Sequence, residues 1–269
     1  MTQQLPWLPD VLEMAKREFE IPLPLANPAT AFTVSAEDHA WIRENAFEKD
    51  AFDTLQLKRR MYENVSTNKA HIEKQTCSLG TILALTETPI SKAQWAEWWH
   101  CVRFICPGRE VRIVFYLHPQ KRLTPAKRES IEAKHINGGA TYPCNTYTII
   151  VYRKEEATRV LLHELLHASC SDPYEKHVSE TEADTEAWAE LCLYALEAKG
   201  DVTKFMKLWK KHLQHAANIS AFLEREHGVH DSSDYAWRYT KGRLDVWKSL
   251  GFVIPTAQSK QYTSLRLTI

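Results

Sequence analysis

The stretch VLLHELLHA, residues 160–168, restricts this chain more than any other part of its sequence. On a helix it is apolar on almost every side, so the helix is expected to be buried. Yet it carries His163, Glu164 and His167. Burial of ionisable groups costs free energy unless they are paired or bound to a ligand. The fold must therefore enclose this helix and also give these three side chains partners.

The spacing of the three residues predicts a metal site. Histidines four residues apart share one face of a helix, so the imidazoles of His163 and His167 can bind the same ion. Glu164 lies about 100° around the helix, where it can take a proton from a water on the metal instead of binding the metal itself. The H-E-x-x-H pattern is short and also arises by chance. A third protein ligand is therefore needed.

The segment SETEADTEAWAELCLYAL, residues 179–196, offers that ligand. On a helix, Glu180 and Asp184 share a face that continues into apolar residues, whereas Glu182 and Glu186 point to the opposite side. We therefore expect Glu180 to be the third ligand and Glu182 and Glu186 to be solvated charges. Asp184, one turn after Glu180, is expected to orient a histidine ligand through its distal N–H.

Other histidines are weaker candidates. In metzincins the motif continues as H-E-x-x-H-x-x-G-x-x-H, but this chain has Cys170 and Pro173 at the positions of the glycine and the last histidine, which excludes that class. His212 and His215 are three residues apart and have no accompanying acidic pattern. They are not expected to form a second metal site. His177 remains open as an alternative third ligand.

The combination of motifs resembles a known family. H-E-x-x-H followed by E-x-x-x-D on the next helix resembles the gluzincin branch of zinc metallopeptidases, the thermolysin-like arrangement, and the second segment is also similar to that of ImmA/IrrE-type peptidases. The resemblance covers roughly residues 110–200. It implies a hydrolase with one Zn²⁺ per chain, bound by His163, His167 and Glu180, and Glu164 as general base. Glu186 departs from the ImmA/IrrE-type pattern, which usually has an aromatic residue there.

Two alternatives stay open beside this peptidase. SprT-like proteases have a similar opening motif and would use His177 as the third ligand, but they usually carry basic or zinc-binding additions that this chain lacks. The second alternative is a binding or structural protein that keeps the zincin fold without cleaving peptides.

A stabiliser of the tetrahedral oxyanion is expected from the C-terminal helical part, because a metal alone rarely supplies all the stabilisation. Gluzincin-like sites often use a tyrosine or histidine for this purpose. Tyr235, Arg238 and Tyr239 are spaced i, i+3 and i+4, so all three can face one cleft. We expect Tyr239 to take the role first, followed by Tyr235 and His230. Alternatively, the segment is a capped helix with its aromatic side chains in the core.

The order of elements predicts an α+β fold, a mostly helical zincin-like domain with a small β-sheet edge before the H-E-x-x-H helix. Two strands are expected at 111–117 and 146–153, and the stretch Gly139–Pro143 or its partner is expected to bind an extended peptide by β-addition. A soft boundary near residue 107 separates a helical region, 1–106, from the core, 107–269, although both can form one continuous domain. Helices are expected at 10–20, 36–45, 51–62, 92–105, 124–134, 156–170, 178–199, 202–225 and 234–249.

Charge and composition exclude several classes of function. The 269 residues contain 34 Lys and Arg against 34 Asp and Glu, a balance that predicts no binding to nucleic acid or to an acidic membrane face. No apolar run approaches the roughly 18 residues of a spanning helix, and no secretory signal is recognised. Without a C-x-x-C pair, the cysteines are expected to be free thiols in a reducing, cytoplasmic environment. The expected partner is a peptide or protein substrate. The cysteines are Cys77, Cys101, Cys106, Cys144, Cys170 and Cys192.

Overall fold

The computed structural model of the chain describes residues 5–24, 33–172 and 175–269; Pro28 and Pro173 lie outside them. The fold is α+β, as predicted. The chain divides into two compact units, each built from separate segments. The helical unit comprises Met1–Ile21, Arg122–Ile136 and Asp172–Ile269, and the sheet unit comprises Pro22–Lys121 and Asn137–Ser171. The boundary predicted near residue 107 falls inside the sheet unit and is corrected accordingly.

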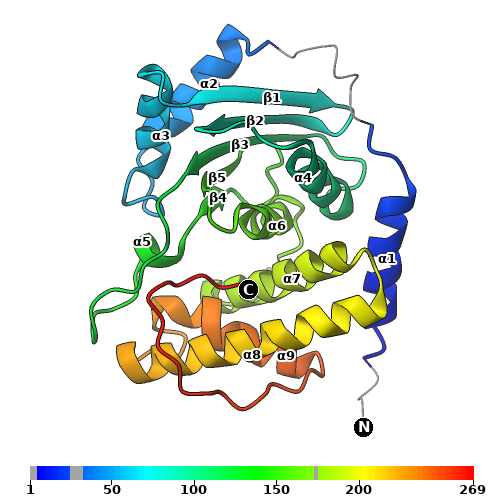
Figure 1. The fold of residues 1–269 in the computed structure, drawn as a ribbon, viewed down its shortest axis with the longest axis vertical. Coiled ribbons are helices and arrows are strands. Elements are labelled where there is room, and N and C mark those ends of the chain that lie inside the picture. The colour runs from blue at the N-terminus through cyan, green and yellow to red at the C-terminus, as the bar shows by residue number, and fades with distance from the viewer. Residues whose placement is uncertain (1–4, 25–32, 173–174) are drawn as a thin grey trace. The chain divides into compact units, whose positions relative to one another are not determined.

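The sheet unit is built on five strands in the order β1-β2-β3-β5-β4 (Figure 1). β2, β3 and β5 run parallel, while the terminal strands β1 and β4 are antiparallel to their neighbours. The predicted strands and the short extended stretch are present. The hairpin of β1 and β2 is not predicted, because its residues fall in the region 1–106, which is expected to be helical. The bounds are β1(His71–Cys77), β2(Gly80–Thr86), β3(Val111–His118), β4(Gly139–Thr141) and β5(Ile149–Arg153).

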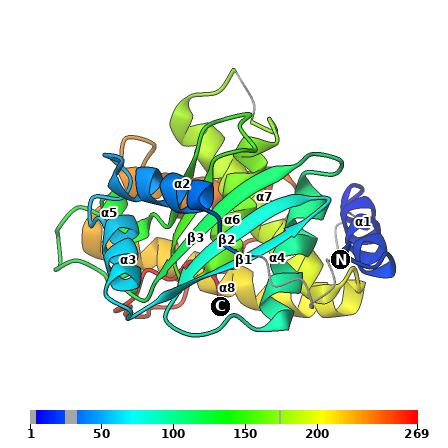
Figure 2. The ribbon, with the colours of Figure 1, turned by 90° about the horizontal axis from the view of Figure 1, so that it is seen from above.

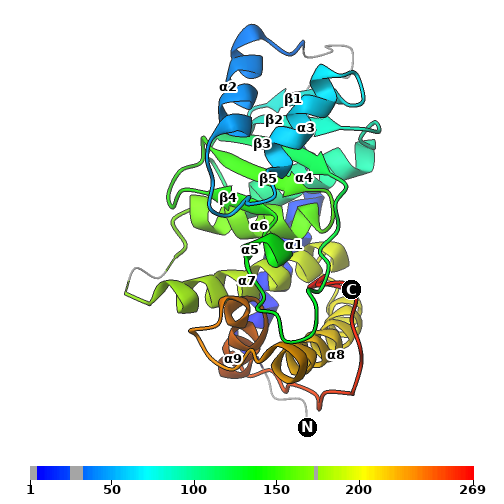
Figure 3. The ribbon, with the colours of Figure 1, turned by 90° about the vertical axis from the view of Figure 1, so that its left-hand side faces the viewer.

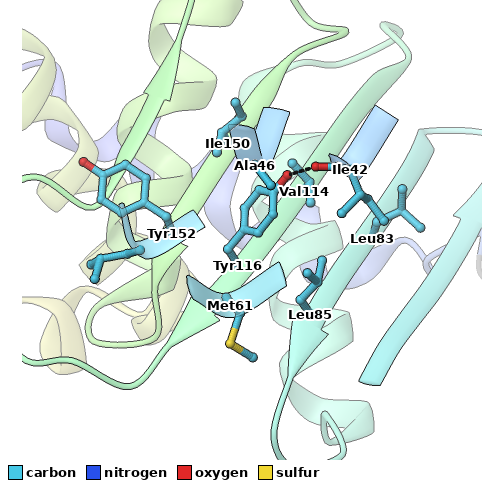
Figure 4. Close-up of a cluster of buried hydrophobic side chains, with 10 residues drawn as sticks. Ile42, Ala46, Met61, Leu83, Leu85, Val114, Tyr116, Ile150 and Tyr152 are labelled. Carbon is cyan, nitrogen blue, oxygen red and sulfur yellow. Dashed lines mark hydrogen bonds between the residues drawn. The ribbon is translucent and has the colours of Figure 1, made fainter. Parts of the chain in front are cut away.

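Helices cover both faces of this sheet. α2(Ala36–Phe47) and α3(Leu57–Ser66) lie on one face (Figure 2), and their apolar side chains join those of β2, β3 and β5 in one buried cluster. Within that cluster the hydroxyl of Tyr116 donates to the carbonyl of Ile42 at 2.6 Å (Figure 4). On the other face, Trp98 of α4(Lys92–Ile105) stacks on Phe115 with ring centroids 3.9 Å apart. α6(Ala157–Ala168) shares that face.

Capping residues explain where several helices begin. Ser35 and Asp38 form the predicted capping box of α2, and Ser91 caps α4. α3 starts at Leu57, later than predicted, because Asp53 accepts the N–H groups of Leu57 and Lys58. The preceding residues therefore form a loop between α2 and α3.

The helical unit contains α1(Leu8–Glu20), α5(Ala133–Ile136), α7(Val178–Ala198) and α8(Val202–His227), followed by η1(Tyr235–Trp237), η2(Arg238–Gly242) and α9(Arg243–Ser249). Most of the predicted helix 124–134 is not helical: only Ala133 and Lys134 belong to a helix, the short α5, and before it Glu129 accepts the N–H of Ala126. The predicted helix 234–249 begins as a 3₁₀ turn and a π-helical turn before it becomes regular. Within the described residues, no helix combines the length and apolar character needed to span a membrane.

Candidate metal centre

The two histidines of α6 bring their Nε2 atoms close together. The Nε2 atoms of His163 and His167 lie 3.1 Å apart, and the ring planes meet at 77°. Two nitrogen ligands on a tetrahedral zinc ion, each 2.0–2.1 Å from it, are about 3.3 Å apart. The helix therefore already holds two imidazoles at the spacing of two ligands of one ion. This donor pair fits a zinc site.

Both histidines and the glutamate between them are buried. His163, Glu164 and His167 are 7%, 6% and 8% exposed, which agrees with the prediction of a buried helix. The side chain of Glu164 lies against the first residue of β4, because a Cβ added to Gly139 would be 2.6 Å from Glu164 Oε1. The same Cβ would be 2.6 Å from a methyl group of Val160. Only a residue without a side chain lets the strand approach α6 this closely.

The strand β4 presents backbone groups at the edge of the sheet. The N–H of Tyr152 donates to the carbonyl of Gly138 at 2.7 Å, and hydrogen-bonded pairs alternate along an antiparallel ladder. Gly139 and Thr141 consequently direct their N–H and C=O groups away from β5. This edge is the one expected to bind an extended peptide. Its first outward residue is also the one that contacts Glu164.

The C-terminal end of α6 is tied to the turn between β4 and β5. The carbonyl of His167 accepts the N–H groups of Cys144, at 2.9 Å, and of Cys170, at 3.2 Å. These two cysteines form a disulfide, with Cα atoms 4.5 Å apart. The prediction that all six cysteines are free thiols is therefore wrong for this pair. Sequence spacing could not reveal it, because the two residues are 26 positions apart.

In the helical unit, α7 presents a different carboxylate from the one predicted. Glu182 is partly buried, and its Oε2 accepts a hydrogen bond from the hydroxyl of Tyr239 at 3.4 Å. Glu180 is exposed. The expectation that Glu182 is a solvated charge is wrong, and Glu180 does not occupy the position expected of a buried ligand.

The other predicted residues of this region have local partners. Asp184 forms an ion pair with Lys176 at 2.5 Å, an alternative to the expected contact with a histidine ligand. His177 is exposed and caps α7, where its Nδ1 accepts the N–H of Ser179 at 3.3 Å. The structure thus assigns both side chains to the start of α7.

Two acids of α7 are buried against other helices, which sets the phase of α7 differently from the prediction. Glu186 and Glu190 are fully buried, although Glu186 was expected in solvent. Arg243 of α9 forms ion pairs with both, and Nε2 of His212 lies 2.7 Å from Glu190 Oε2. Their partners come from α8 and α9, so no pattern within α7 marks these acids as internal. His212 is correspondingly a core residue of the helical unit.

The candidate oxyanion stabilisers differ in their surroundings. Tyr239 is buried in the π-helical turn η2, a type of turn that is frequent at functional sites. Burial, with Glu182 nearby, raises the pKa of Tyr239 well above its usual value, so its hydroxyl remains a donor. Tyr235 is partly buried beside it, with ring centroids 5.7 Å apart. His230 is exposed, and its Nδ1 lies 3.7 Å from Glu224 of α8.

Three comparisons with known proteins do not assign a family. Neither the models of protein families, nor the curated proteins, nor the solved structures gave a match to this chain.

Proposed function

We propose that this protein is a zinc-dependent peptidase. The observation that carries the proposal is the 3.1 Å spacing between Nε2 of His163 and Nε2 of His167, on a buried helix that also carries Glu164. Two buried imidazoles with their Nε2 atoms this close can serve as two ligands of one metal ion. The resemblance of the motif to gluzincins supports the same reaction.

Glu182 is the third ligand in this proposal, in place of Glu180. The proposed set of ligands is therefore His163, His167 and Glu182. The partial burial of Glu182 favours it, and so does its place beside the hydroxyl of Tyr239, which lies 3.4 Å from its Oε2. Exposed Glu180 has no comparable support. Three protein ligands leave a fourth position open for a water or a substrate.

The chain's own residues supply the remaining chemistry. Zinc, when bound, lowers the pKa of a water and polarises a carbonyl group. Glu164 takes a proton from the attacking water and passes it to the departing amine. The outward N–H and C=O groups of Gly139 and Thr141 align the substrate as an added strand. Since Gly139 also lies against the Glu164 carboxylate, this strand brings the scissile bond to the base.

Zinc content tests the metal centre. Protein purified without added metal is expected to contain one zinc per chain by elemental analysis. His163→Ala and His167→Ala should each lose it, because two remaining protein ligands bind zinc poorly. Circular dichroism should show that the variants stay folded. Stoichiometric zinc in the double alanine variant would refute the assignment of these histidines.

A cleavage assay tests the enzyme itself. Incubation with a complex peptide mixture, followed by mass spectrometry, should reveal new termini with the wild type. Glu164→Gln is the matched control, because it should keep zinc and fold but lose nearly all cleavage. Equal cleavage by the two proteins would overturn the role of Glu164. Zinc binding without any cleavage would favour a zincin-type scaffold that binds peptides without hydrolysing them.

A further inference from the structure

The loop between α2 and α3 lies beside the edge strand of the sheet unit (Figure 3). The hydroxyl of Tyr142, the residue after β4, donates to Glu48 of this loop at 3.4 Å. The hydroxyl of Tyr152 on β5 donates to the carbonyl of Phe52 at 2.9 Å. Two hydrogen bonds from neighbouring strands thus fix the loop against this end of the sheet.

Three exposed aromatic residues lie in or next to the segments that these hydrogen bonds join. Phe47, Phe52 and Tyr142 are 48%, 51% and 61% exposed. Phe47 is held in place by an edge contact with Tyr62 and by the guanidinium of Arg59 over its ring. Phe47 also lines a pocket of about 340 Å³ in the loop, within the range of about 300–1,000 Å³ typical of ligand sites. Large apolar side chains left in solvent mark a candidate binding surface.

The geometry of the sheet predicts what reaches this surface. Successive side chains of a strand point to opposite faces. Gly139 and Thr141 face α6, so Ala140 and Tyr142 face the side covered by α2 and α3, in agreement with the bond from Tyr142 to Glu48. A strand added to β4 follows the same alternation. The side chains of the added strand that do not face α6 therefore point toward the loop between α2 and α3.

We propose that Phe47, Phe52 and Tyr142 form a specificity subsite for large apolar, preferably aromatic, side chains of an extended substrate bound along β4. This inference rests on the proposed peptidase function and deepens it. The preferred side chains belong to alternate positions of the substrate, because only every second residue points away from α6. Two of the cations that line the pocket are already paired: Lys58 with Asp50, and Arg59 with Glu63. In this proposal the selectivity comes from the three aromatic residues.

Peptide binding tests the subsite without turnover. Zinc-loaded Glu164→Gln protein is immobilised and exposed to a randomised peptide library, and the bound peptides are sequenced. We expect enrichment of Phe, Tyr, Trp or Leu at positions two residues apart. In the same background, Phe52→Ser and Tyr142→Ser should each weaken the Kd of the most enriched peptide about tenfold. Leu123→Ser, at an equally exposed apolar residue of the helical unit, is the matched control and should leave the Kd unchanged.

The outcomes separate the subsite from the enzyme. Enrichment without an apolar preference, or a preference that Phe52→Ser and Tyr142→Ser leave intact, overturns the subsite. Failure of the library to bind also overturns it. If enriched peptides bind in the predicted pattern but the wild type never cleaves them, the subsite stands and the peptidase function fails.

Discussion

The backbone of Gly139 lies against the carboxylate of Glu164, so close that a Cβ at this position would be 2.6 Å from Oε1. That Cβ would also be 2.8 Å from the carbonyl oxygen of Ile150. The flexible end of a glutamate gives way more easily than the backbone of a central strand. The steric clash of a side chain at Gly139 is therefore relieved by displacement of Glu164 or of β4 itself.

Gly139→Ala should consequently lower turnover by about 100-fold, since small misplacement of a catalytic group has effects of this size. Zinc content should remain at one per chain, because the atoms nearest to the added methyl group belong to Glu164, Val160 and Ile150 and not to a histidine ligand. Gly108→Asn is the matched control: it lies in open space, and asparagine tolerates its φ of +72°. Parallel measurement of zinc and of cleavage rate decides the prediction. Full activity in Gly139→Ala would show that the strand and the base are not coupled.

The fold was predictable where sequence patterns are local. Runs of β-branched and aromatic residues identified β3 and β5, and serines at the cap positions located α2 and α4. The hairpin of β1 and β2 was missed. β1 is the polar segment HIEKQTC, partly exposed along most of its length at the edge of the sheet. An edge strand buries too little apolar surface to leave a clear pattern.

Only the part of the site that depends on local sequence patterns was predictable. Helix geometry alone fixes the relation of His163 to His167, so their spacing identified both. The phase of α7 depends on Arg243, whose ion pair with Glu190 joins residues 53 positions apart. A buried acid compensated by such a distant partner is indistinguishable, in sequence, from a solvated one. The side of the helix on which Glu182 lies is therefore not readable from the sequence of α7 alone.

The hydroxyl of Tyr239 is expected to act on the reaction more than on the metal. Its bond to Glu182 is long, at 3.4 Å, and therefore weak in the resting protein. Its raised pKa keeps the hydroxyl protonated and able to donate to an oxyanion. Tyr239→Phe should lower turnover by about 100-fold or more, as loss of an oxyanion donor does elsewhere, with zinc retained. Tyr235→Phe, measured beside it, should have a much smaller effect.

Acid should destabilise the protein through His118. Burial, with Arg60 and Arg153 nearby, lowers the pKa of His118 to about 4 from 6.5, and its Nδ1 accepts the N–H of Gln120. Between these two values the unfolded chain binds a proton that the folded chain excludes, so stability falls as the pH drops from 6.5 toward 4. Denaturant unfolding at pH 7 and pH 5 should show a smaller loss for His118→Asn, which keeps an acceptor without a titrating ring. An equal loss in both proteins would exclude His118 as a source of acid sensitivity.

The disulfide between Cys144 and Cys170 should contribute measurably to stability. A disulfide that closes a chain segment of this length is expected to raise the free energy of unfolding by about 3–4 kcal/mol, because it restricts the unfolded state. The double variant Cys144→Ser, Cys170→Ser should lose that amount in denaturant unfolding, and reduction of the wild type should reproduce it. Alkylation of the unfolded protein should label four cysteines before reduction and six after. Six labels without a reductant would show that the pair is not oxidised.

The choice between two glutamates of α7 can be made by zinc affinity alone. Glu182 is partly buried and accepts a bond from Tyr239, whereas Glu180 is exposed. Glu182→Ala should therefore reduce zinc affinity strongly, because it removes one of three protein ligands. Glu180→Ala, two positions away on the same helix, should stay within a few-fold of the wild type. Competition with a chromophoric chelator measures both variants under identical conditions. If Glu180→Ala lost the metal while Glu182→Ala retained it, Glu180 would be the third ligand, as the sequence predicts, and the proposal of Glu182 would be wrong.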